Sequence, residues 1–144
     1  MTAASFCMLS AGLFFLSGLI FGAWKYAAIV RSERAQAPVY VDVAHRAALL
    51  YAFACALLSQ LCATNAWANR VNLTAAVVLI SYFALSVFGY AIHGALRDTD
   101  NQLQRPHRLG NKTIPNGAML SFMVSLVLAE VSAFLVIFSG YVMA

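Results

Sequence analysis

The chain has 144 residues, of which 62% are hydrophobic and only 10% are charged, with a formal net charge of +4. A soluble domain carries roughly 25% charged residues, so this composition excludes a soluble protein and predicts one integral membrane domain. The basic residues flank apolar stretches instead of forming a continuous basic surface, which argues against nucleic acid as a partner.

Long apolar stretches predict an all-α fold, a four-helix bundle embedded in the lipid bilayer. We expect the four transmembrane helices at about residues 5–30, 43–67, 72–96 and 115–142. Pro38 breaks any helix that continues from the first span, and Asp42 then stands where it could cap the second. Pro115 is well placed for the first turn of the fourth helix.

The basic residues predict the orientation. Eight of the nine lie in or beside the two long connections, namely Lys25, Arg31, Arg34, Arg46, Arg97, Arg105, Arg108 and Lys112. Only Arg70 lies on the other side. The positive-inside rule therefore places both long loops in the cytoplasm and both termini outside, as expected of a multi-pass protein of the plasma (inner) membrane.

Small residues and one buried charge predict a homo-oligomer, a trimer in the first instance. Gly18 and Gly22 form a GxxxG pair that would admit another helix, and Ala129 and Ala133 form a second small patch. Glu130 stands alone in the fourth helix, where an ionised carboxylate costs a few kcal/mol at least. It would be protonated, bonded to a buried hydroxyl such as Tyr82, Ser86 or Ser17, or used in an oligomer contact.

Two histidines enter apolar helices from the cytoplasmic side. His45 lies near the start of the second helix and His93 near the end of the third, so antiparallel packing would place them at one depth. Facing imidazoles in a bundle are a common way of holding haem b, and Gly89, one turn from His93, would clear room for a flat group. Each histidine could equally be an interfacial residue bonded to a loop carbonyl.

The groups around the histidines have expected roles as well. Arg46, Arg97, Arg105 and Arg108 are candidates to hold the haem propionates by charge-assisted pairing. Asp42, Asp98 and Asp100 are expected to pair with loop arginines, which disfavours a divalent metal site. His107, beside Pro106, is expected to order the loop.

The run Ala44-His45-Arg46-Ala47-Ala48-Leu49-Leu50-Tyr51 resembles the haem-ligand segment of the styrene oxide isomerases. These are small four-helix membrane proteins that form trimers, bind haem b between protomers and use ferric iron as a Lewis acid to open epoxides. The resemblance implies that His45 is the iron ligand and that a small apolar epoxide is the substrate. Tyr51, where that family has asparagine, and Tyr90 are the candidate catalytic residues; Ile80 replaces an acidic residue of the family.

Two other functions fit the same pattern. The microsomal glutathione transferase and eicosanoid synthase family shares the four helices, the trimer and a cytoplasmic-side site, but its arginine, asparagine and glutamate signature is missing after Arg46. Alternatively, the chain is an accessory subunit of a larger membrane complex that docks through residues 97–112. Haem absorbance, glutathione retention and co-purifying partners discriminate the three.

Overall fold

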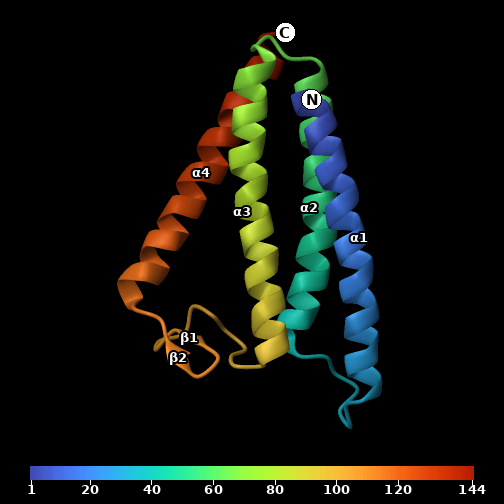
Figure 1. Ribbon diagram of the computed structural model, residues 1–144, viewed down its shortest axis with the longest axis vertical. Helices are drawn as coiled ribbons and strands as arrows, with labels where there is room; N and C mark the ends of the chain where they lie inside the picture. Colours follow the sequence, from blue (N-terminus) through green and yellow to red (C-terminus); the bar gives the residue numbers. More distant parts are fainter.

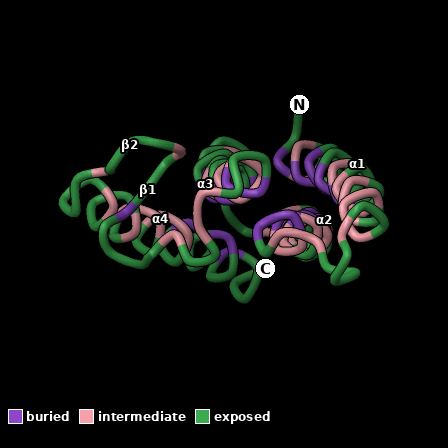
Figure 2. Tube along the Cα trace, turned by 90° about the horizontal axis from the view of Figure 1, so that it is seen from below, coloured by how far each residue is buried: buried purple, intermediate pink, exposed green.

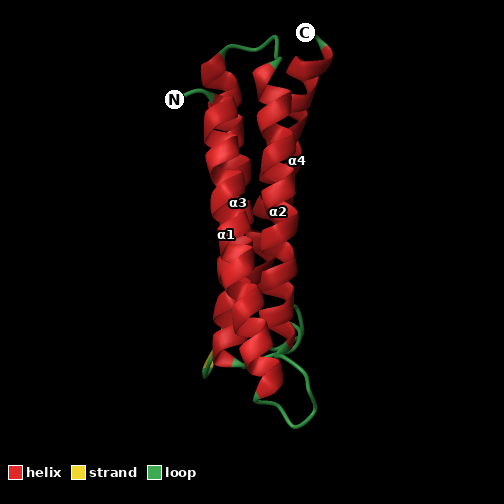
Figure 3. Ribbon diagram, turned by 90° about the vertical axis from the view of Figure 1, so that its right-hand side faces the viewer, coloured by secondary structure: helices red, strands yellow, loops and turns green.

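The computed structural model describes all residues, 1–144, and shows four long helices running side by side (Figures 1 and 3). The helices are α1 (Ala3–Val30), α2 (Val39–Ala63), α3 (Asn69–Leu96) and α4 (Asn116–Val142). A short antiparallel hairpin, β1 (Arg108–Leu109) with β2 (Lys112–Thr113), precedes α4. All four helices are long and apolar enough to cross a membrane, which confirms the predicted all-α membrane bundle.

The bundle has two chemically different ends. Both termini lie at one end, here called the terminal end, together with the short turn 64–68 (Figure 1). The loops 31–38 and 97–115 lie at the opposite end, here called the loop end. The assignment of the loop end to the cytoplasm stays a prediction.

The second helix is displaced from the range expected from the sequence. It begins at Val39, directly after Pro38, and ends at Ala63, four residues earlier than predicted at each end. The expected capping role of Asp42 is wrong, since Asp42 lies inside the first turn and Pro38 occupies the cap position. Proline tolerates this place because it has no N–H to leave unpaired.

The α1 and α2 helices form a close pair because α1 carries glycine at the contact. A Cβ on Gly18 would come within 2.6 Å of the Leu49 side chain, and one on Gly22 within 3.0 Å of the His45 ring. The GxxxG pair therefore serves packing inside one protomer. Ala133 is also buried, at 6% exposure. Gly18, Gly22 and Ala133 therefore pack within one protomer and lend no support to a trimer, and the oligomeric state stays a prediction.

The fourth helix is attached mainly at the terminal end. Its only buried residues are Ala133, Ile137 and Gly140. Asn65 donates from Nδ2 to the Ile137 carbonyl at 2.9 Å, and the Ala66 amide donates to the Gly140 carbonyl at 2.9 Å. Towards the loop end α4 diverges from α3 (Figure 1), and Figure 2 shows the buried residues gathered mainly between α1, α2 and α3.

Candidate functional site

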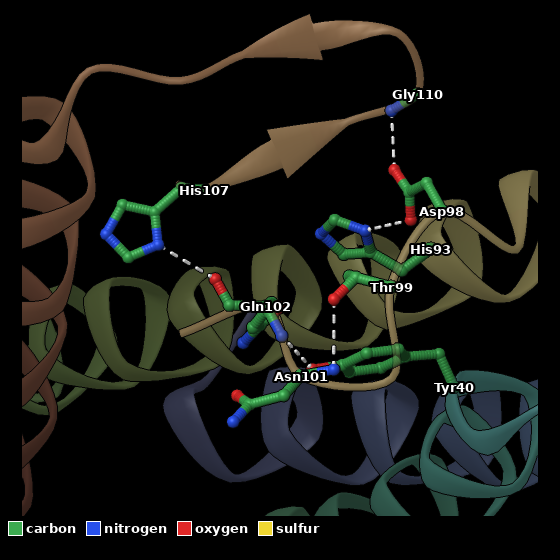
Figure 4. A network of polar contacts seen from close by, with 8 residues as sticks. All are labelled: Tyr40, His93, Asp98, Thr99, Asn101, Gln102, His107 and Gly110. Carbon is green, nitrogen blue, oxygen red and sulfur yellow. Dashed lines mark hydrogen bonds and ion pairs between the residues drawn. The ribbon is translucent and has the colours of Figure 1, made fainter. Parts of the chain in front are cut away.

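A buried histidine–carboxylate pair closes the loop end of α3. The helix ends at Arg97, whose left-handed conformation (φ 51°, ψ 38°) turns the chain back, and its amide donates to the His93 carbonyl at 2.8 Å. This turn brings Asp98 beside the ring of His93, with 2.7 Å between Nδ1 and Oδ1 (Figure 4). His93 is only 5% exposed, so the pair is shielded from bulk water.

The second oxygen of Asp98 accepts a hydrogen bond from the Gly110 amide at the tip of the hairpin. Burial alone would raise the pKa of the Asp98 carboxyl, but the hydrogen bonds from His93 and Gly110 outweigh burial and hold this pKa below its usual value. Asp98 is therefore ionised at neutral pH and can only accept. The Nδ1 atom of neutral His93 must then carry the proton, which leaves Nε2 with a free lone pair.

The rest of the loop is fixed around this pair. The hydroxyl of Tyr40 accepts from the Gln102 amide at 2.6 Å, while the Tyr40 ring packs on His93 with centroids 5.2 Å apart (Figure 4). His107 is buried and donates from Nδ1 to the Gln102 carbonyl at 3.1 Å. This contact fits the predicted loop-ordering role of His107.

A cavity of about 230 Å³ opens beside His93, between α3 and the diverging half of α4. Its lining consists of Tyr51, Leu85, Ser86, Gly89, Tyr90, His93, Gln102, Met119, Phe122, Met123 and Leu126. Four of the predicted site residues, Tyr51, Gly89, Tyr90 and His93, thus line one cavity. A Cβ built on Gly89 would meet nothing within 4 Å, so space is indeed free there. The volume lies below the roughly 300–1,000 Å³ of drug-sized ligand sites.

His45 lies elsewhere, on the face of α2 that contacts α1. Its Nδ1 is 2.8 Å from the carbonyl oxygen of Gly18, and its ring lies over Gly22. A carbonyl can only accept, so Nδ1 donates and Nε2, which contacts no protein hydrogen-bonding group, keeps its lone pair. His45 does not line the His93 cavity, so one protomer does not bring the two histidines into a common site.

The arginines predicted to bind the propionates also lie in separate places. Arg46 pairs with Asp42 at 2.9 Å, and Lys25 of α1 reaches the other oxygen of that carboxylate at 2.5 Å. This charged cluster carries a net positive charge at the loop end of the His45 face. Arg97 is exposed and contributes to the His93 region through its backbone.

Asp98 and Asp100 were both assigned wrongly, since we expected each to pair with a loop arginine. Asp98 pairs with His93 and the Gly110 amide, and Asp100 makes no ion pair. The spacing of five between His93 and Asp98 was the available signal. It becomes meaningful only when Arg97 is known to end the helix in a left-handed turn.

Glu130 is a second polar group, farther from the loop end than His93. It lies with Val131, Phe134 and other apolar side chains of α2, α3 and α4 around a cavity of about 300 Å³. Its Oε1 atom is buried and has no hydrogen-bond partner in the protomer. The expected bond to Tyr82, Ser86 or Ser17 is therefore not made by this oxygen.

No protein-family model matches the chain, and neither a curated protein nor a solved structure does. The function must therefore be argued from the side chains themselves.

Proposed function

We propose that the protein binds haem b through His45. The observation that carries the proposal is the 2.8 Å contact between His45 Nδ1 and the Gly18 carbonyl. A metal-binding histidine usually donates a hydrogen bond from its other ring N–H to a carbonyl or carboxylate. This bond fixes the tautomer and the ring orientation. In His45 this contact supports Nε2 as the free ligand atom.

The surroundings of His45 suit the cofactor. Gly22 presents no side chain against the ring, and the space that a Cβ would fill is occupied by the imidazole itself. Lys25 and Arg46 lie at the loop end of the same region and offer two cations for the propionates, against the single carboxylate of Asp42.

His45 is only partly buried within one chain. This exposure supports a site completed by a second copy, and we propose the homotrimer that the resemblance to the styrene oxide isomerases implies. Ferric haem with an open position would supply Lewis-acid chemistry for a small apolar epoxide. His93 lines a different cavity of its own chain and takes no part in this proposal.

The absorption spectrum of the detergent-purified protein, expressed with added haem, tests this proposal. We expect a Soret band in the wild type and none in His45→Ala, because that substitution removes the ligand without opening the buried core. His93→Gln is the matched control and should retain the band.

Two other results would contradict the haem assignment. A colourless wild-type protein that retains glutathione would favour the membrane transferase alternative. A colourless protein that co-purifies with fixed partners would favour an accessory subunit.

A further inference from the structure

The carboxyl of Glu130 lies about halfway along the bundle, and its buried Oε1 has no hydrogen-bond partner. It is 14 residues into the 27-residue helix α4, and Leu79 and Phe83, near the middle of α3, line the same cavity. Apart from Glu130, every residue that lines this cavity is hydrophobic. An ionisable residue at this depth is costly, and such residues commonly mark paths for ions or protons.

The cavities of Glu130 and His93 lie along one seam between α2, α3 and α4. On α4, Leu126 lines the His93 cavity and Glu130 follows four residues later on the same helical face. The two cavities also share a wall, because Tyr51 of the His93 cavity stacks on Phe83 of the Glu130 cavity. The ring centroids are 4.1 Å apart and the ring planes differ by 8°.

Hydroxyl groups line this seam between the two ends. Tyr51, Ser86 and Tyr90 all face the His93 cavity, and each hydroxyl can both accept and donate a hydrogen bond. The cavity volume of about 230 Å³ has room for several waters at ~30 Å³ each.

The spacing of residues along α3 places hydroxyls between the two cavities. His93 and Phe83 are ten residues apart on α3, which corresponds to ~15 Å along the helix. The intervening hydroxyls of Tyr90 and Ser86 come at the third and seventh residues from His93, so they lie on one face.

We propose that this seam is a proton pathway that connects the loop end of the bundle to Glu130. Nε2 of His93 takes a proton from water that enters the His93 cavity and becomes imidazolium, whose charge Asp98 balances. The proton then leaves Nε2 through the hydroxyls and cavity water to the Glu130 carboxylate. His93 returns to its neutral form and Glu130 becomes a carboxylic acid, so no other reactant is needed. This inference does not depend on haem binding.

Four ionisable side chains contact the pathway besides its two ends. They are Tyr40 and Tyr51 from α2, Tyr90 from α3 and Asp98 from the loop. Between the loop end and Glu130, α4 contributes only apolar side chains to the lining of the His93 cavity. No charged side chain of that helix therefore competes for the proton there.

The test is kinetic. In proteoliposomes, a light-triggered pH drop is followed by infrared difference spectroscopy of the carboxyl C=O band that Glu130→Gln lacks. We expect the carboxyl band of the wild type to grow after the pH drop, as Glu130 takes up a proton. His93→Gln should slow this step at least tenfold and leave its final amplitude unchanged. Added imidazole should restore the rate.

Tyr90→Phe and Tyr82→Phe form a matched pair that leaves the histidine in place. Tyr90 lines the cavity, whereas Tyr82 packs on Phe122 and lines neither cavity. The pathway predicts slower protonation in Tyr90→Phe only. Equal rates in His93→Gln, Tyr90→Phe and the wild type would overturn the proposal. A Glu130 band insensitive to pH, with loss of oligomers in Glu130→Gln, would also overturn it and assign the carboxyl to a protomer interface.

Discussion

Asp98 holds the loop 97–115 against α3, and the variant Asp98→Asn measures how much stability it contributes to this docking. The carboxylate accepts from two buried donors, His93 Nδ1 and the Gly110 amide. Asparagine offers one acceptor oxygen, so one of these bonds is lost. Hydrogen bonds to charged groups contribute ~1.5–3 kcal/mol, so we expect about 2 kcal/mol less stability for the docked loop. At about 1.4 kcal/mol per tenfold, this is a ~30-fold shift towards the undocked form.

Amide hydrogen exchange measures this shift directly. The Ile114 amide donates to the His107 carbonyl within the same loop. Protection of the Gly110 and Ile114 amides should fall ~30-fold, while protection of the amides in the middle of α1 and α2 should stay the same. Asp100→Asn is the matched control, because Asp100 is exposed and makes no ion pair. Equal loss of protection in both variants, or none in Asp98→Asn, would refute the role given to Asp98.

Four further predictions follow from the same contacts. Because hydrogen bonds lower the pKa of Asp98, its contribution to loop docking is full above the usual aspartate range. It is lost only as pH falls through the lowered value, which hydrogen exchange against pH would show. Gly22→Leu should displace His45 and abolish haem binding, whereas Gly12→Leu, at a site with nothing within 4 Å, should not; a Soret band checks both. Arg97→Gly should stabilise the α3 terminus by up to about 1 kcal/mol in thermal unfolding, since glycine adopts the left-handed conformation without a Cβ clash. A cysteine added at the N-terminus should react with an impermeant reagent in intact spheroplasts, and protection there would reverse the orientation.

The helices were predictable because charge-free length is enough to define a membrane span. The ends of α2 were harder to predict, because Pro38 occupies the cap position where Asp42 was expected. Propensity favoured Asp42 as a cap, but Lys25 and Arg46 hold that carboxylate one turn later. Tertiary partners from another helix cannot be identified from spacing alone.

The candidate site was predicted as a set of residues but not as an arrangement. Gly89, Tyr90 and His93 share one face of α3, so helical periodicity brought them together, and Tyr51 joins them from α2. His45 was expected opposite His93, yet its ring turns to α1 because Gly18 and Gly22 leave space there. The position of a residue along its helix predicts how far it lies from the end of the bundle. The neighbouring helix decides the direction in which its side chain faces.

The most direct test of haem binding at His45 is a titration of haem into detergent-purified protein, followed at the Soret band. We predict a saturable spectral change in the wild type that His93→Gln retains and His45→Ala loses, with the bundle folded in all three. Identical titrations of wild type and His45→Ala would contradict the assignment of His45 as the ligand.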